Sequence, residues 1–239
     1  MISIERKILG EYLKTIMSEG DKCSVSMASL DFSPEGCHAF SSNGVSGESM
    51  TFTVKGTLKP SAFSVLPKEV ETYNINNLGE FLSITEALDG IISIEKQNNF
   101  IVISDTKGKT VYYILTADEY IPKAKEVKLE FKNGTIMEVD IFREIVSNAK
   151  KLGIKTYKIT VKDKVMKISC GDDKSTHLEK RIKIDMPDVI CGFIAGFDAV
   201  FDNLPGPKIT LYLMENAPLK ATSETGNMRI EYVLAPAAV

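Results

Sequence analysis

Apolar and polar residues follow two periods along this chain, and the periods distinguish helices from strands. Between Ile4 and Met17 apolar residues recur about every 3.6 positions, which predicts an amphipathic helix. A similar stripe predicts a second long helix at Asp140–Leu152, with a glycine just past its end. Shorter apolar stripes predict two further helices at Asn76–Leu88 and Gly196–Asn203.

Runs rich in β-branched and aromatic residues, separated by turn residues, predict strands joined as hairpins. In the first half of the chain these runs are Cys23–Phe32, Cys37–Ser42, Ser49–Lys55, Val70–Ile75, Ile91–Glu95, Phe100–Asp105 and Thr110–Leu115. In the second half they are Val127–Phe131, Ile136–Val139, Lys155–Val161, Val165–Cys170, Lys180–Ile184, Lys208–Met214, Leu219–Thr225 and Arg229–Leu234.

The two halves show the same order of elements: a long helix, strands, a short helix and a three-stranded meander. The order is repeated, although the residues are not. We therefore expect an α+β fold with two topologically similar domains, at residues 1–117 and 126–239. Residues 118–125, with a proline and mixed charge, are expected to form the connector between them.

Composition places the chain among globular proteins. It has 239 residues, of which 44% are hydrophobic and 26% charged, and such a chain can bury a sizeable core. No apolar stretch is long enough to span a membrane, and the N-terminus lacks the pattern of a signal peptide, so we expect a cytoplasmic protein that does not bind membranes. The four cysteines form no CxxC pair and are interpreted as reduced, mostly buried thiols.

Motifs for catalysis are missing from the sequence. It contains no phosphate-binding loop, no dinucleotide fingerprint and no nucleophile elbow. Its two histidines, His38 and His177, stand in no metal-ligand pattern. We therefore expect no catalytic residues, no metal and no cofactor, and a binding or scaffolding role is the better starting hypothesis.

Basic residues lie on the polar faces of both long helices although the net charge is −3. Such charges can face DNA phosphates without reading sequence, and the absence of aromatic residues among them favours duplex over single-stranded DNA. The alternative is that these are the solvated lysines of any amphipathic helix. The candidate DNA-binding residues are Lys7, Lys14, Arg143, Lys150 and Lys151.

Three segments resemble DNA polymerase sliding clamps of the phage and PCNA type. Ile230–Pro236 is similar to the Tyr-x-Leu-Ala-Pro ending of archaeal and eukaryotic clamps, and Tyr73–Leu82 and Ile145–Cys170 resemble T-even-type phage clamps. The resemblance implies a non-catalytic processivity factor of DNA replication: a head-to-tail homotrimer that encircles double-stranded DNA, is loaded by a clamp loader ATPase and tethers the DNA polymerase. If the source is viral, the compartment is the host cytoplasm.

The resemblance also implies an architecture and a set of interfaces. The helices would line the hole of the ring, with antiparallel sheets outside, and the negative net charge would make the outside acidic. The short helices depart from the family pattern because they carry acidic residues and no Lys or Arg. Subunits would join through edge strands, for which the candidates are Thr110–Leu115 and Lys167–His177.

A partner peptide would bind between the domains, beside the connector and the C-terminus. The candidate residues are Tyr120, Ile121, Pro122, Leu234, Ala235 and Pro236. The alternative for the connector is that Ile121 only holds it against the domain surface. The alternative for the whole chain is a duplicated-domain α+β ligand-binding protein or enzyme unrelated to replication, which would need a pocket with converging polar groups.

Overall fold

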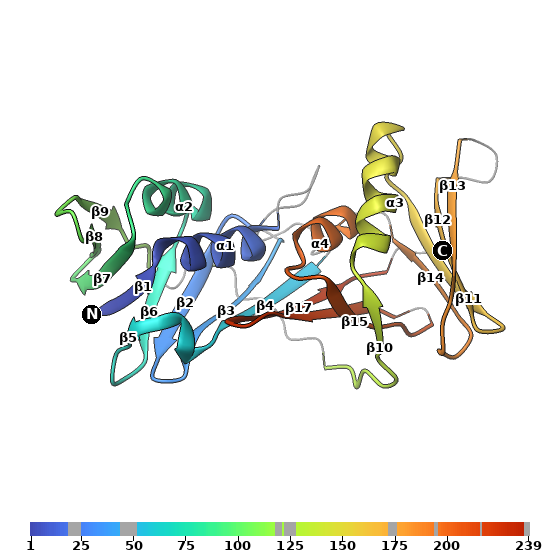
Figure 1. Ribbon diagram of the computed structural model, residues 1–239, viewed down its shortest axis with the longest axis horizontal. Coiled ribbons are helices and arrows are strands. Elements are labelled where there is room, and N and C mark those ends of the chain that lie inside the picture. The colour runs from blue at the N-terminus through green and yellow to red at the C-terminus, as the bar shows by residue number, and fades with distance from the viewer. Residues whose placement is uncertain are drawn as a thin grey trace.

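The computed structural model describes residues 1–18, 25–43, 52–117, 121, 128–171, 176–193, 196–215 and 217–236. Within these residues, four α-helices lie along one side of an elongated molecule, with strands beneath them and at both ends (Figure 1). Every strand pairing is antiparallel. The predicted α+β fold is confirmed.

The elements follow the predicted order in both halves. In the first half they are β1 (Ile2–Glu5), α1 (Arg6–Met17), β2 (Ala28–Ser33), β3 (Gly36–Ser42), β4 (Phe52–Leu58), η1 (Pro60–Ala62), β5 (Phe63–Val65), β6 (Glu71–Ile75), α2 (Leu78–Glu86), β7 (Ile91–Gln97), β8 (Phe100–Asp105) and β9 (Thr110–Ile114). In the second half they are β10 (Thr135–Glu138), α3 (Asp140–Lys151), β11 (Tyr157–Lys162), β12 (Val165–Cys170), β13 (Leu178–Lys183), β14 (Val189–Phe193), α4 (Phe197–Asn203), β15 (Lys208–Tyr212), β16 (Leu219–Glu224) and β17 (Met228–Leu234).

The described strands form three sheets. Their strand orders are β5-β1-β7-β8-β9, β10-β15-β16-β17-β4-β3-β2-β6 and β13-β12-β11-β14. The eight-stranded sheet contains strands from both halves, because β17 pairs with β4 from Met228 opposite Leu58 to Leu234 opposite Phe52. This pairing joins the two halves through a continuous ladder of backbone hydrogen bonds. We call it the internal joint.

Strand pairing is repeated between the halves as well as element order. The pairs β1·β7, β7·β8, β8·β9, β2·β3, β3·β4 and β2·β6 of the first half correspond to β10·β15, β15·β16, β16·β17, β11·β12, β12·β13 and β11·β14 of the second. Only the segment before β6 in the first half and before β14 in the second half differs clearly. It carries η1 and β5 in the first half, whereas residues 184–188, all described, form no strand.

Two predicted elements need correction, and strands β5 and β14 were missed. The first helix begins at Arg6, because Ile2 and Ile4 are buried in strand β1, opposite Ile94 and Ile92 of β7. The described residues 128–131 of the predicted strand Val127–Phe131 form no strand. Strand β14 was not predicted, although its alternating burial is that of a strand with one face in the core.

One core contact at the internal joint depends on a glycine. The ring of Tyr12 on α1 lies over Gly56 of β4, so close that a Cβ at Gly56 would stand 2.8 Å from a ring carbon. Beside it, the Tyr232 hydroxyl of β17 donates a hydrogen bond to the carbonyl of Thr15 and contacts the hydroxyl of Ser18 at the end of α1. Helix α1 and strand β17 are therefore fixed to each other across the two halves.

Candidate functional site

The structure places the five predicted DNA-binding residues on the helices, where acidic neighbours engage three of them. Lys14 Nζ lies 2.6 Å from Glu86 of α2, and Lys150 Nζ lies 2.6 Å from Asp202 of α4. Arg143 pairs with Asp140 at 3.0 Å and donates to the Leu204 carbonyl at 2.7 Å. These side chains are half-exposed, so each ion pair contributes little to stability.

Lys7 and Lys151 are exposed, and neither forms an ion pair with the residues that the structure describes. Taken together, however, the four helices carry six basic and seven acidic residues. The helical layer alone is therefore not a basic surface. Any attraction to DNA phosphates from this side depends on local groups such as Lys7 rather than on an overall positive field.

The strongest cluster of basic residues lies on a different face, which sequence reasoning missed. The four-stranded sheet turns Tyr157, Ile159, Met166 and Ile168 inward. Its other face carries Lys158, Lys162, Lys167, Arg181 and Lys183, with Glu179 as the acidic residue among them. The expectation of an acidic outside is wrong for this face. These residues come from three strands, so no single predicted strand showed the cluster.

Among the edge strands of the described sheets, β9 and β13 stand at opposite ends of the molecule (Figure 1). The predicted edge Thr110–Leu115 contains β9, which pairs on one side only, with β8. The predicted edge Lys167–His177 is wrong, because β12 pairs with both β11 and β13. Strand β13 is the edge instead. Residues 172–175, just before it, lie outside the described residues, and no local pattern indicates which strand of the hairpin lies outermost.

The candidate partner site is described only in part. Tyr120 and Pro122 lie outside the described residues. Ile121 is buried, as in the alternative in which it holds the connector against the protein. Leu234 is fully buried in β17, opposite Phe52 and Leu219, whereas Ala235 and Pro236 are half-buried beyond the strand.

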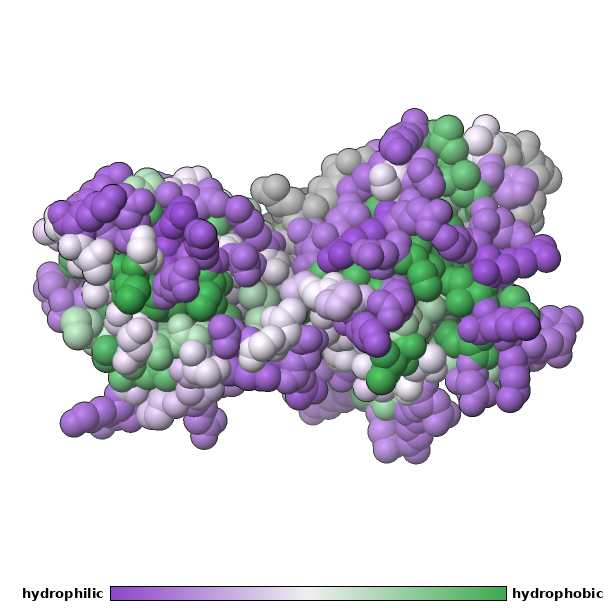
Figure 2. All heavy atoms as spheres, viewed as in Figure 1, coloured by the Kyte–Doolittle hydropathy of each residue, from purple (hydrophilic) through white to green (hydrophobic). Residues whose placement is uncertain are grey.

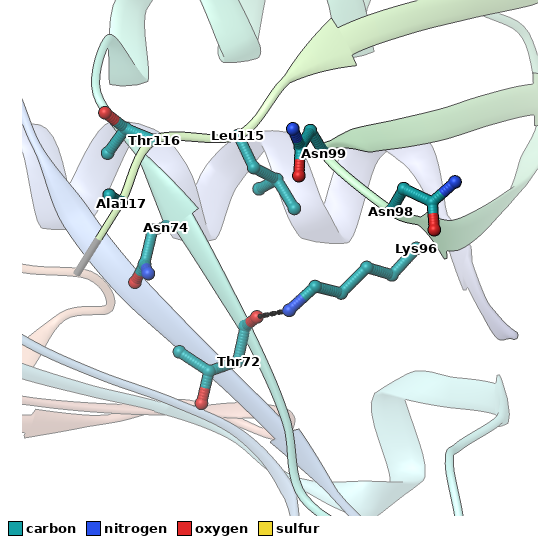
Figure 3. A pocket seen from close by; sticks show the side chains of 8 residues that line it. All are labelled: Thr72, Asn74, Lys96, Asn98, Asn99, Leu115, Thr116 and Ala117. Atoms are coloured by element: carbon teal, nitrogen blue, oxygen red, sulfur yellow. Dashed lines mark hydrogen bonds between the residues drawn. The ribbon is translucent and has the colours of Figure 1, made fainter.

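A polar hollow of about 390 Å³ lies just before the connector, between edge strand β6 and the β7–β8 turn (Figure 3). Lys96 Nζ donates a hydrogen bond to the Thr72 carbonyl at 3.0 Å, so the lysine occupies part of the open edge of β6. The other lining residues are Asn74, Asn98, Asn99, Leu115, Thr116 and Ala117. Among the described residues that line this hollow, Lys96 is the one with an ionisable side chain.

Other observations bear on the expected chemistry. The described residues contain no group of three or more His, Cys, Asp or Glu that could hold a metal ion. None of the described helices is long and apolar enough to cross a membrane. Cys37, Cys170 and Cys191 are buried free thiols, as predicted, and burial raises the pKa of Cys170 to about 12. A thiol with so high a pKa is a poor nucleophile.

Comparisons with known proteins agree on the architecture. No protein-family model matches the sequence, and no curated protein matches it significantly. The Proliferating Cellular Nuclear Antigen (PCNA) of Entamoeba histolytica superposes with a TM-score of 0.79 at 16% identity, covering 99% of each chain. The A. fulgidus PCNA, solved with the C-terminal region of FEN-1, superposes with a TM-score of 0.80 at 16% identity, covering 100% of this chain and 99% of that one. This chain therefore has the fold of the PCNA sliding clamps over its full length.

Proposed function

We propose that this protein is a DNA sliding clamp. Three copies would close head to tail into a ring around duplex DNA and tether the replicative DNA polymerase, without catalysing a reaction. A clamp loader ATPase would open the ring, and in a virus this would happen in the host cytoplasm. Two domains, residues 1–117 and 126–239, joined by residues 118–125, would make up each subunit.

The observation that carries this proposal is the pair of open strands. Within the chain, β4 of the first half pairs with β17, the last strand of the second half. Their counterparts are β13 in the second half and β9 in the first, and both are edges. If β13 of one copy pairs with β9 of the next, the internal joint is repeated between copies. Such a head-to-tail contact closes into a ring when its rotation fits.

The side chains of the open strands fit this pairing. Tyr112 and Ile114 of β9 are 66% and 65% exposed, which is unusual for large apolar residues on an open edge strand. The edge of β9 also has free backbone groups. Leu115 N donates to Asn99 O and Asp105 N donates to Lys109 O, so odd-numbered residues face β8. The N–H groups of Tyr112 and Ile114 therefore point to the open edge.

The helical layer and the partner site complete the proposal. The superposed clamps support placing α1 to α4 around the hole, where Lys7, Lys14, Arg143, Lys150 and Lys151 would face phosphates. A partner peptide would bind beside Tyr120, Ile121 and Pro122, near Leu234, Ala235 and Pro236. The A. fulgidus clamp was solved with the C-terminal region of another protein, which favours a peptide site on this fold.

Tyr112→Pro tests ring closure. It removes one backbone donor at the open edge while leaving the β8·β9 ladder intact, since Tyr112 N–H faces away from β8. Native mass spectrometry should show wild-type trimers near three times 26.4 kDa and monomers of the variant. Ile136→Pro is the matched control. Val139 N donates to Pro207 O, so the Ile136 N–H also points away from its neighbour β15, but β10 has no part in the proposed joint.

A wild-type protein that stays monomeric at micromolar concentration contradicts the proposed ring. A folded Tyr112→Pro variant that still forms trimers contradicts the choice of β9 as the interface. A monomer that binds a small molecule in the hollow around Lys96 supports the rival, a ligand-binding α+β protein. Circular dichroism establishes that each variant is folded before its mass is compared.

A further inference from the structure

The outer face of the sheet β13-β12-β11-β14 carries a cluster of basic side chains to which the proposed clamp function gives no role, although its edge strand β13 is the one proposed to join the next copy. We call it the basic face and define it by Lys158, Lys162, Lys167, Arg181 and Lys183. In Figure 2, hydrophilic residues project at the right-hand end of the molecule, where Figure 1 places these strands. Because α3 packs on the other face of this sheet, the basic face points away from the helices.

The strand registers place these charges next to one another. Lys167 stands directly opposite Arg181 on β13, and Lys183 lies in the next outward-facing row with Lys162 and Val165. Like charges on directly opposite residues destabilise a sheet. Glu179 offsets part of this repulsion, since it lies 2.9 Å from Lys167 and 2.6 Å from Arg181. Five basic residues against one acidic residue still leave a strong positive excess.

The matching face of the first half shows that the fold does not require this charge. The counterparts of β11, β12 and β13 are β2, β3 and β4, and their outward residues are mostly Ser, Thr, His38 and Phe40, with Asp31 and Lys55 as the charged ones. Asp31 accepts a hydrogen bond from Thr72. The basic residues are therefore a property of the second half alone.

We propose that the basic face binds the phosphate backbone of duplex DNA without reading its sequence. Charge complementarity selects a polyanion, and the polar surface lacks the large buried apolar anchor that a protein partner usually needs. No outward residue of β11, β12 or β13 is aromatic, so the face offers no platform on which single-stranded bases could stack. This inference rests on the proposed clamp function. The contact would hold a DNA segment that runs outside the ring.

A duplex with both ends blocked by biotin–streptavidin separates this contact from threading through the hole. Without a loader, a closed ring cannot pass onto such DNA, whereas an outer face can still bind it. We expect fluorescence anisotropy at low salt to show binding to the blocked duplex. The triple variant Lys158→Glu, Lys162→Glu and Lys183→Glu should lose this binding, and these three lysines form none of the ion pairs described above.

Salt dependence adds a quantitative measure. If the three lysines each neutralise one phosphate, their removal lowers the slope of log K against log salt by about 2.7. The matched control, Lys68→Glu, Lys128→Glu and Lys132→Glu, changes the net charge equally on exposed residues elsewhere and should keep the wild-type slope. A second comparison, Lys7→Glu with Lys151→Glu, should leave binding to the blocked duplex unchanged.

Three results would overturn the proposal. Wild-type protein that does not bind the blocked duplex excludes an outer DNA contact. A triple variant that binds like wild type places the contact elsewhere. Binding of polyglutamate in place of DNA, lost in the same variant, assigns the basic face to an acidic protein segment. Because Lys183 lies on β13, the proposed interface strand, native mass spectrometry of the triple variant must still show trimers. Failure here is then distinguishable from failure of the clamp proposal.

Discussion

The internal joint and the open edges have the same topological place but opposite chemistry. In the joint, Gly56 of β4 makes room for the ring of Tyr12 on α1. Its counterpart in β13 is Lys180, since Gly56 stands opposite Ala39 of β3 and Lys180 opposite Ile168 of β12. Lys180 forms an ion pair with Glu144 of α3 where the joint has an aromatic contact. The internal joint is packed like a protein core at this position, whereas the matching position of β13 is polar.

On the outer side the contrast is reversed, because the internal joint carries an ion pair and the open edge carries exposed aromatic residues. At the internal joint, Lys220 pairs with Glu231 at 2.7 Å and lies 5.5 Å from the ring centre of Phe131. In β8 and β9 the matching positions are Phe100 and Tyr112, which are 44% and 66% exposed. Lys180 is a charged residue on the inward side of the free edge strand β13, and such residues hinder non-specific strand addition. If β13 of one copy pairs with β9 of the next, as proposed, we expect that joint to open more readily than the internal joint.

Gly56→Ala should have the largest effect on the internal joint. The new Cβ would stand 2.8 Å from a ring carbon of Tyr12 and 3.2 Å from Ile16, and Tyr12 is fully buried and cannot swing away. We expect a loss of about 2 kcal/mol in the free energy of unfolding, measured by urea denaturation. Gly226→Ala is the control, since nothing lies within 4 Å of its added Cβ. Equal stability of both variants would show that the Tyr12 contact is not tight.

Tyr232→Phe should have a smaller effect, because it removes one hydroxyl from a packed ring. Tyr232 donates to the Thr15 carbonyl, and its ring packs against Phe52. Since Ser18 also donates to Thr15, that carbonyl keeps a partner, and we expect a loss of about 1 kcal/mol. Tyr112→Phe on the open edge is the matched control and should leave the unfolding midpoint of the monomer unchanged. A similar loss in both variants would contradict a special role for the internal joint.

Sequence periodicity predicted the helices well because their apolar stripes are long. Helix α3 was predicted to within one residue, since Asp140 opens it and Gly153, with φ of 68°, follows its end. Strand β1 was merged with α1 because Ile4 fits both a helical stripe and the alternation of a buried strand. Strand β13 was predicted as Lys180–Ile184, but its place at the edge was missed, because order in a sheet depends on pairing between distant residues, which no local pattern records.

The candidate sites were less predictable than the fold. Sequence alone identified basic residues on the helices, yet Lys14 and Lys150 are engaged by Glu86 and Asp202, which come from helices distant in the chain. The basic face was missed for the same reason, since its residues come from three strands and gather only when the sheet forms. Tyr232 was recognised through its motif, but its hydrogen bond to α1 lies across 217 residues.

The pH dependence of the Tyr232→Phe difference gives the finest test of the internal joint. Burial raises the pKa of the Tyr232 hydroxyl above its ordinary value of 10.0, whereas its hydrogen-bonding contact with the Ser18 hydroxyl acts in the opposite direction. The folded state therefore keeps the neutral form when the unfolded chain ionises. The stability that this neutral hydroxyl provides is fully present below pH 10 and is lost as pH rises toward the folded pKa.

The free energy of unfolding of the wild type should consequently fall by about 1.4 kcal/mol per pH unit above pH 10 because of Tyr232. The Tyr232→Phe variant lacks this contribution. The difference of about 1 kcal/mol at pH 8 should then vanish near pH 11. Other buried tyrosines, such as Tyr12 with its raised pKa, are common to both proteins and cancel in the comparison. Urea denaturation at pH 8, 10 and 11 measures the difference directly. A difference that stays constant with pH would mean that the Tyr232 hydroxyl reaches solvent, and that the internal joint opens as readily as a joint between copies.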